Sequence, residues 1–141
     1  MCYNKQGDDM KKTINIKYNS IFKYETHKET IQYKEIGTYE KTNKGTFIKF
    51  SSKETKIQIR MHQDTVWLMN NQSELQLVKG KRIKNKYATM YGDINIDTYM
   101  ETFEDNGNIK IKYQLLDQNS CISEVYILIH IQNMELEDEN T

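Results

Sequence analysis

The chain has 141 residues, with 20 basic and 20 acidic side chains that leave a formal net charge of zero, and it contains no proline. This length most simply forms one domain, whose core needs neither disulfides nor metal. The balanced charge gives no overall field that would attract nucleic acid or an anionic membrane. Any such interaction would have to depend on a local patch.

The start of the chain is polar and lacks the apolar run of a signal peptide, and no stretch approaches the length of a transmembrane helix. We therefore expect a soluble cytoplasmic protein without a membrane partner. The composition also divides the chain. We expect a polar tail over residues 1–11, one domain over residues 12–133 and an acidic tail over residues 134–141.

Alternation of apolar and polar residues predicts β-strands along most of the chain. A long first strand runs from Thr13 to Tyr24, and a less regular second strand covers residues 30–40, with Gly37 as a candidate bulge. Shorter alternating runs follow, separated by turn residues. Strands are expected at residues 46–50, 57–62, 65–69 and 75–78, and the last strand contains Val125, Ile127, Ile129 and Ile131.

The clearest local signal is a hairpin centred on Asn106 and Gly107. Asn-Gly between two alternating runs is typical of a two-residue type I′ turn, in which both central residues need a positive φ. This turn predicts the register of the two strands. The expected opposite pairs are Thr98 with Leu115, Met100 with Tyr113, Thr102 with Ile111 and, on the other face, Glu101 with Lys112.

The predicted register agrees with the side-chain chemistry of both faces. The apolar residues share one face, whereas Glu101 and Lys112 form an opposite-charge pair worth up to about 1 kcal/mol at an exposed surface. A slip by one residue would move every isoleucine of the hairpin to the other face. The hairpin is therefore expected to bury one face only.

Together these segments amount to roughly nine or ten strands joined by short polar connections, and no helix is placed to link parallel strands. A sheet with so many strands curls or splits into two layers, and sequential hairpins can remove its edges by closing on themselves. We predict an all-β fold, an antiparallel closed barrel of about 8–10 strands, in preference to a sandwich.

A series of glycine, aromatic and apolar residues between Gly80 and Leu115 is recognisable. It consists of Gly80, Tyr87-x-Thr89-x-x-Gly92, Ile94, Ile96, Thr98, the turn at Gly107 and the alternating run 109–115. This series resembles the YwiB-like family of small bacterial proteins. The resemblance extends over residues 12–133 and implies a calycin-like, lipocalin-like barrel, but it implies no function, since none is established for the family.

Two features depart from these relatives. The turn at Met69, Asn70 and Asn71 stands where relatives tend to carry a basic residue and a glycine, so no role of that turn can be transferred. True lipocalins also carry glycine-x-tryptophan near the first strand, whereas Trp67 lies in mid-sequence here. The resemblance therefore concerns topology and not the lipocalin motif.

The leading functional hypothesis is non-catalytic binding of a small apolar or aromatic ligand inside the barrel or at its mouth. Barrels of about eight strands are just wide enough to be filled by side chains or to hold one small ligand. Tyr18, Tyr33 and Tyr113 alternate with apolar residues, so they are candidates to line the interior, and Trp67 is a further candidate contact. The alternative is a solid core filled by large side chains.

A second hypothesis concerns the basic segment 79–86, which is followed by Tyr87 and Tyr91. Basic residues with nearby aromatic rings can hold a nucleic-acid backbone and stack bases. The alternative is a solvated edge strand whose lysines discourage pairing with other sheets, and the zero net charge makes nucleic acid the less favoured partner. The residues concerned are Lys79, Lys81, Arg82, Lys84 and Lys86.

The sequence contains no nucleophile elbow, phosphate loop or dinucleotide fingerprint. The three histidines and two cysteines occur in no metal or redox spacing, so we expect free thiols, no metal, no cofactor and no enzyme activity. A third hypothesis is a structural subunit that pairs through an exposed strand with a partner or with itself as a homodimer. The histidines and cysteines are His27, His62, His130, Cys2 and Cys121.

Overall fold

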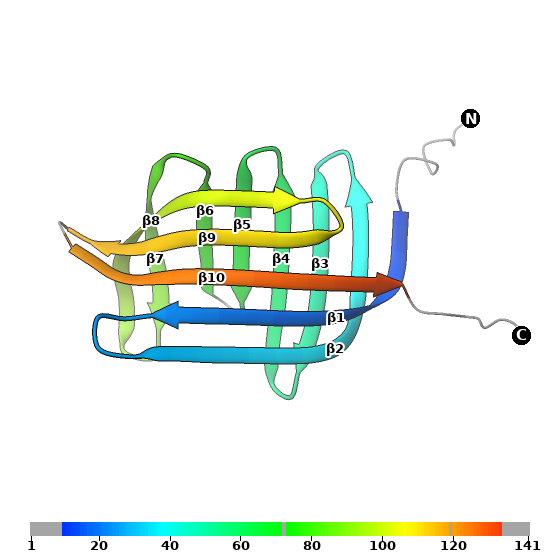
Figure 1. Cartoon of the computed structure of the whole chain (residues 1–141), viewed down its shortest axis with the longest axis horizontal. Helices are drawn as coiled ribbons and strands as arrows, with labels where there is room; N and C mark the ends of the chain where they lie inside the picture. The colour runs from blue at the N-terminus through cyan, green and yellow to red at the C-terminus, as the bar shows by residue number, and fades with distance from the viewer. Residues whose placement is uncertain (1–9, 72, 119, 134–141) are drawn as a thin grey trace, which may run out of the picture.

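The computed structural model describes residues 10–71, 73–118 and 120–133, and within them the chain forms ten β-strands and no helix (Figure 1). The predicted all-β class is therefore confirmed. No described segment is a helix that could cross a membrane. The strands are β1 (Met10–Lys23), β2 (Lys28–Thr42), β3 (Gly45–Ser52), β4 (Thr55–His62), β5 (Thr65–Asn70), β6 (Ser73–Val78), β7 (Arg82–Thr89), β8 (Gly92–Asp105), β9 (Asn108–Asp117) and β10 (Ser120–Asn133).

The strands form one sheet in the order β6-β5-β4-β3-β2-β1-β10-β9-β8-β7, and every ladder between neighbours is antiparallel. The first strand meets the last along ten register pairs, from Ile14 with Asn133 to Lys23 with Glu124. β6 and β7 lie at the two ends of this order and share no ladder. The barrel is therefore nearly closed, and the predicted antiparallel barrel is confirmed.

The strands fall into two groups that cross at a steep angle. β1, β9, β10 and most of β2 run across the view of Figure 1, whereas β3, β4, β5 and β6 run upright behind them. β2 passes from one group to the other, because it pairs with β1 from Lys28 onward but with β3 only from Thr38 onward. The space between the two groups holds the core.

Gly37 lies where β2 begins to pass between the groups. The register with β1 runs through Gly37 without interruption, so Gly37 is not the bulge that we predicted there. A Cβ atom built on Gly37 would stand 2.2 Å from the carbonyl oxygen of Lys49, closer than any side chain tolerates. The glycine is needed because the two strands approach closely.

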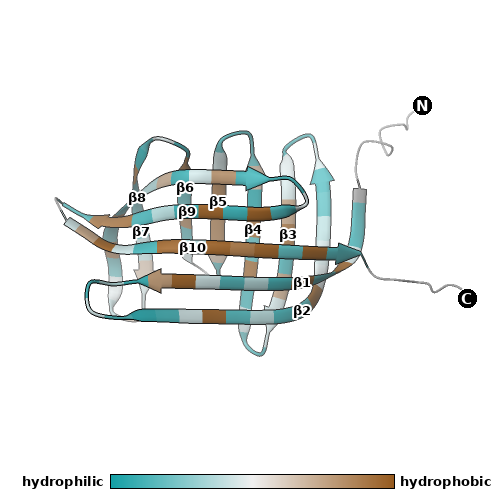
Figure 2. Cartoon of the chain, in the orientation of Figure 1, coloured by the Kyte–Doolittle hydropathy of each residue, from teal (hydrophilic) through white to brown (hydrophobic). Residues whose placement is uncertain are grey.

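Alternation decides which residues enter the core, as bands of opposite hydropathy along β9 illustrate (Figure 2). On β10, the predicted inward residues Val125, Ile127 and Ile129 are all buried, whereas Leu128 is 46% exposed on the other face. The other buried apolar residues are Ile14, Ile16, Tyr18, Ile48, Phe50, Ile57, Ile59, Met61, Val66, Leu77, Met100, Ile109, Ile111 and Tyr113.

The β8–β9 hairpin follows the predicted register only at its open end. Met100 faces Tyr113 as predicted, but the register then shifts by one, so that Phe103 and not Thr102 faces Ile111. An extra residue at Glu101 makes this β-bulge, which turns a large aromatic side chain toward the core in place of a threonine. The ion pair that we predicted is present, with Lys112 Nζ 3.2 Å from Glu101 Oε1.

The turn of this hairpin is also longer than predicted. Asp105 pairs with Ile109, which leaves a loop of three residues between them. Only Gly107 in this loop has a positive φ, of 105°, and Asn106 does not, so the turn is not type I′. The extra loop residue and the bulge compensate each other, and the apolar residues of both strands still face inward.

Candidate functional site

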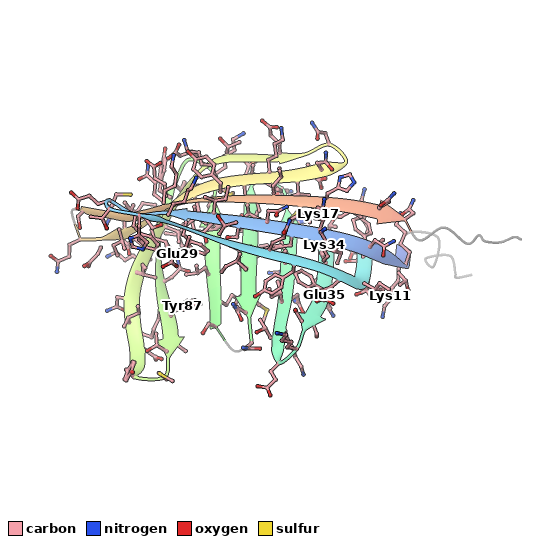
Figure 3. All side chains as sticks on the ribbon, turned by 60° about the horizontal axis from the view of Figure 1, so that its bottom comes forward. Lys11, Lys17, Glu29, Lys34, Glu35 and Tyr87 are labelled. Atoms are coloured by element: carbon pink, nitrogen blue, oxygen red, sulfur yellow. The ribbon has the colours of Figure 1, made fainter. Side chains whose placement is uncertain are left out.

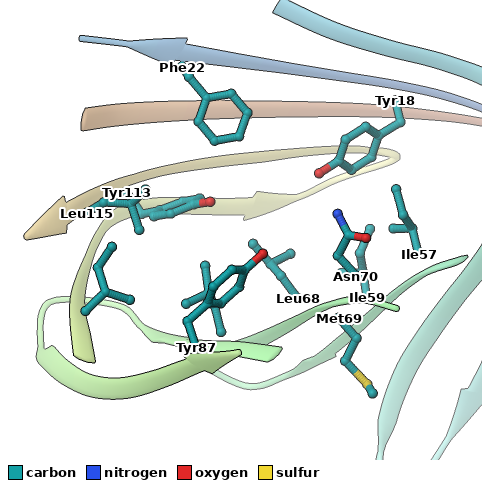
Figure 4. Close-up of a pocket in the computed structure, with 12 residues that line it drawn as sticks. Tyr18, Phe22, Ile57, Ile59, Leu68, Met69, Asn70, Tyr87, Tyr113 and Leu115 are labelled. Atoms are coloured by element: carbon teal, nitrogen blue, oxygen red, sulfur yellow. The ribbon is translucent and has the colours of Figure 1, made fainter. Parts of the chain in front are cut away.

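A cavity of about 210 Å³ lies between the two groups of strands (Figure 4). It is mostly apolar, and its lining comes from seven strands, β1 and β4 to β9. The twelve lining residues are Tyr18, Phe22, Ile57, Ile59, Leu68, Met69, Asn70, Leu75, Tyr87, Ile96, Tyr113 and Leu115.

Two aromatic rings that are not part of the lining pack against the ring of Tyr18. The Tyr18 ring lies 5.9 Å from the Tyr33 ring and 5.7 Å from the Phe50 ring, measured between centroids. Tyr33 and Phe50 are themselves 5.7 Å apart, so the three rings form a compact cluster. Such tilted aromatic pairs favour one ring orientation. This packing directs the Tyr18 hydroxyl toward the cavity (Figure 4).

Two phenols of the lining are almost completely removed from water. Tyr18 is 9% exposed and Tyr113 is 3% exposed. Burial raises the pKa of both phenols above the ordinary value of 10.0, and at Tyr113 the neighbouring phenols add to the rise. Both groups therefore stay protonated at neutral pH, and each can donate a hydrogen bond into the cavity.

The polar side chain next to the Tyr18 hydroxyl, within the part of the chain that the structure describes, is Ser20. Burial raises the pKa of Tyr18 and the nearby Ser20 hydroxyl acts to lower it, but the buried Ser20 Oγ itself has no hydrogen-bond partner. Figure 4 shows the hydroxyls of Tyr18, Tyr87 and Tyr113 turned toward the middle of the cavity. The lining thus combines an apolar wall with a few converging polar groups.

Asn70 and Tyr87 mark the mouth of the cavity. Both residues also line an adjoining depression of the surface, together with Lys56, Ser73 and Met90 among others. Asn70 is the last residue of β5 and is exposed. A small molecule that enters between these two side chains would meet the phenols inside.

The mouth lies at one end of the seam between β6 and β7, which side chains close in place of a backbone ladder. The Asn85 amide accepts from the Gln76 backbone N–H at 2.8 Å and donates to its carbonyl oxygen at 3.3 Å. The Thr98 hydroxyl also donates to the Gln76 carbonyl at 2.7 Å, and the Ser73 hydroxyl donates to the Ala88 carbonyl at 2.8 Å. Asn85 therefore acts as a substitute peptide group.

The structure separates the four predicted ligand contacts. Tyr18 and Tyr113 line the cavity together. Tyr33 lies behind Tyr18 and is not part of the lining. Trp67 lies on the outer face of β5, where the guanidinium carbon of Arg60 stands 3.7 Å from the centre of its ring.

Several lining residues were not among the sequence candidates. Asn70 was interpreted as part of a turn, and Tyr87 as an aromatic neighbour of the basic segment. On β7, however, the half-buried residues Ile83, Asn85 and Tyr87 alternate with exposed basic residues. That period of two was a usable signal for an inward Tyr87. Phe22 lies four residues after Tyr18 in the predicted first strand, so alternation places both on the same face.

The basic segment lies on β7, at one end of the sheet order, and in the connection before it, and the Asp97 carboxylate lies near two of its residues. The Arg82 Nε donates to Asp97 Oδ2 at 2.6 Å, and its Nη2 donates to the Gln118 carbonyl at 2.6 Å. Lys84 is exposed and stands opposite Asp97 in the β7–β8 ladder. Lys86 lies in the same strand, whereas Lys79 and Lys81 belong to the connection between β6 and β7.

A second group of basic residues lies on the outer face of the sheet. Lys17 and Lys34 are exposed register partners on β1 and β2, and His130 faces Lys17 from β10 (Figure 3). Asn108 Oδ1 lies 2.7 Å from the His130 Nδ1. Like charges directly opposite each other destabilise a sheet. The Lys17–Lys34 pair is therefore expected to lower the stability of the sheet.

His27, His62 and Cys121 are not part of the cavity lining. His27 Nε2 is 3.3 Å from Glu29 Oε2 on the exposed surface, and His62 is exposed at the end of β4. Across residues 10–71, 73–118 and 120–133, no group of three or more histidine, cysteine or acidic side chains could hold a metal ion. Cys121 is an exposed free thiol, and Cys2 lies outside the described residues.

Comparisons with known proteins agree with this architecture. The model of the family described as Domain of unknown function (DUF1934) matches residues 5–129, so the chain belongs to that family. The fold is similar to the crystal structure of the ywiB protein from Bacillus subtilis, with a TM-score of 0.71 over 91% of this chain and 98% of that chain. The two sequences are 15% identical, so this likeness concerns the fold alone. No curated protein matches the chain.

Proposed function

We propose that this member of the DUF1934 family is a non-catalytic binding protein that holds one small apolar or aromatic molecule in the cavity between its two groups of strands. The observation that carries the proposal is the cavity itself. Its wall is mostly apolar, and two almost fully buried phenols point into the cavity. Ligand sites typically combine such walls with a few convergent polar groups.

The size of the cavity limits the ligand. A dry apolar cavity of about 150 Å³ in another protein binds benzene, and the cavity here measures about 210 Å³. It therefore suits a molecule slightly larger than benzene, below the size of most drug-like ligands. A single substituted ring, or a branched aliphatic compound of similar volume, fits these dimensions.

The chemistry of the lining supports binding without catalysis. Among the twelve lining residues, tyrosine is the only ionisable type, and burial raises the pKa of Tyr18 and Tyr113. A general base or nucleophile at neutral pH needs a group whose pKa lies near the working pH. The two buried phenols are shifted in the opposite direction, which makes them hydrogen-bond donors.

Titration of the protein with one-ring compounds, followed by two-dimensional NMR up to millimolar concentrations, tests this proposal. We expect saturable shifts of the amide signals of Leu68, Tyr113 and Leu115. The variant Leu68→Phe should fill part of the cavity and abolish these shifts. Leu128→Phe is the matched control, because Leu128 is 46% exposed on the outer face, and it should bind as the unchanged protein does.

Two results would overturn the proposal. One is the absence of saturable binding by any compound of the panel, together with no small molecule retained in native mass spectra of protein purified from cells. The other is binding that persists unchanged in a folded Leu68→Phe protein, which would move the site away from the cavity. Circular dichroism establishes that each variant has folded.

A further inference from the structure

The polar atoms inside the cavity restrict the chemistry of its occupant beyond size. Tyr18 and Tyr113 approach from β1 and β9, which belong to the same group of strands, and their hydroxyls converge with that of Tyr87 (Figure 4). Among the hydrogen bonds of the described residues none involves either of these hydroxyls, and the Ser20 hydroxyl beside Tyr18 has no partner of its own. An occupant that lacks an acceptor would leave both donors unpaired.

We infer that the occupant is an uncharged one-ring compound with a hydrogen-bond-accepting oxygen, such as a carbonyl, and that Tyr18 and Tyr113 donate to this oxygen. This inference rests on the proposed function, since it specifies the ligand of the same cavity. An empty cavity can offer water to the phenols. A carbonyl replaces that water without losing its hydrogen bonds, whereas a hydrocarbon cannot.

Charge is disfavoured because nothing in the lining would balance it. None of the twelve lining residues is a lysine, arginine, histidine, aspartate or glutamate. An ionised ligand would lose its hydration on entering and would find only neutral groups. Lys56 is the one basic residue of the depression at the mouth, and it lies outside the cavity lining.

Four compounds of matched size separate these possibilities. Acetophenone carries a carbonyl, and α-methylstyrene replaces that oxygen by a methylene group on the same carbon skeleton. Benzoate is an anion and benzylammonium is a cation. By NMR titration we expect acetophenone to bind about five- to tenfold more tightly than α-methylstyrene, the contribution of about one neutral hydrogen bond. Benzoate and benzylammonium should bind at least about tenfold more weakly than acetophenone.

Phenylalanine variants assign the effect to the phenols. Tyr18→Phe and Tyr113→Phe remove one oxygen each and keep the ring, so each should reduce the preference for acetophenone over α-methylstyrene while α-methylstyrene still binds. Tyr33→Phe is the matched control in the same aromatic cluster, because Tyr33 is not part of the lining. It should keep the full preference.

The outcomes distinguish this inference from the proposed function. If α-methylstyrene binds as tightly as acetophenone and Leu68→Phe abolishes both, the cavity binds small molecules but the inference is wrong. The tightest binding by benzoate or benzylammonium would likewise reject it. If none of the four compounds binds, the proposed function fails and the inference fails with it. A preference that survives Tyr18→Phe combined with Tyr113→Phe would show that the phenols are not the donors.

Discussion

The β1–β10 junction and the β6–β7 junction of the barrel differ in how the two strands are held together. β1 and β10 join the ends of the chain through ten consecutive register pairs. β6 and β7 face each other through the side chains of Ser73 and Asn85, and Thr98 of β8 also donates to the Gln76 carbonyl oxygen. The cavity and its mouth lie beside the second junction. The barrel thus has a firmly paired side and a side that side chains close.

Packing follows the same division. β1, β9 and β10 each contribute at least three buried apolar residues to the core, whereas no residue of β7 is buried. Only one of the twelve lining residues of the cavity, Tyr87, comes from β7. The cavity spans both sides, because Tyr18 and Tyr113 line it from β1 and β9 and Tyr87 lines it from β7. We conclude that the paired side carries more of the buried core, while the β6–β7 side closes the cavity.

The largest expected contrast comes from truncating one core residue on each side. Ile129→Ala removes a fully buried side chain on β10 and should lower the free energy of unfolding by about 2–5 kcal/mol. Ile83→Ala affects a half-buried residue of β7 and should cost less than about 2 kcal/mol. Urea denaturation measures both. Equal losses would mean that the seam side carries as much of the core energy as the ladder side.

A smaller effect is expected from opening the seam at Asn85. Asn85→Ala leaves the Gln76 N–H without its partner, which should cost about 1–3 kcal/mol. Hydrogen exchange should accelerate at Gln76 and leave β1 and β10 unchanged. Asn95→Ala, on the exposed part of the same hairpin, is the matched control and should change stability by less than about 0.5 kcal/mol.

The outcome for β1 and β10 decides whether the two sides are independent. If Asn85→Ala accelerated exchange in β1 and β10 to the same degree as at Gln76, the barrel would open as one cooperative unit. Asn85→Asp gives a further test, because its carboxylate can accept from the Gln76 N–H but cannot donate to the Gln76 carbonyl. Its stability should lie below that of the unchanged protein.

The sequence predicted the strands and most inward residues, because a period of two depends only on the local pattern. The positions of Val125, Ile127 and Ile129 on the buried face show this. The bulge at Glu101 could not be predicted in the same way. Both Thr102 and Phe103 can face inward in an extended chain, and the choice depends on how much space the opposite strands leave at that point.

The side-chain contacts between β6 and β7 and the presence of the cavity could not be predicted from the sequence for a related reason. In the sequence, Asn85 is an ordinary polar residue of an edge strand. Its role depends on the distance between β7 and β6, which its side-chain amide spans to reach the Gln76 backbone. The residues predicted for the interior were compatible with either a filled or a hollow core, and the spacing of the two groups of strands decides between them. Tyr18 and Tyr113 were therefore predictable as inward residues, but not as lining of a cavity.

The buried phenols should make the stability sensitive to alkaline pH. Since burial raises the pKa of Tyr18 and Tyr113 above 10.0, the unfolded chain releases their protons above pH 10 while the folded chain retains them. Stability is therefore unaffected below the unfolded pKa and falls as the pH rises above it, by about 1.4 kcal/mol per pH unit for each tyrosine.

The comparison of two variants isolates this effect from other titrating groups. The double variant Tyr18→Phe and Tyr113→Phe should lose stability less steeply between pH 10 and 11, as measured by urea denaturation. Tyr91→Phe, at a residue that is 93% exposed, should decline as the unchanged protein does. Identical slopes for all three proteins would show that the two phenols ionise freely in the folded state.

The smallest expected effect lies on the firmly paired side, where the surface charge pattern can still be improved. Lys17 and Lys34 are exposed and directly opposite each other, so Lys34→Glu replaces a repulsive pair by an attractive one. We expect a gain of about 0.2–1 kcal/mol in the free energy of unfolding. The gain should shrink at 1 M salt, where screening acts within about 3 Å. Lys34→Gln should give a smaller gain, because it removes repulsion without adding attraction. A loss of stability in both variants would mean that the Lys34 side chain contributes through packing on the sheet and not through its charge.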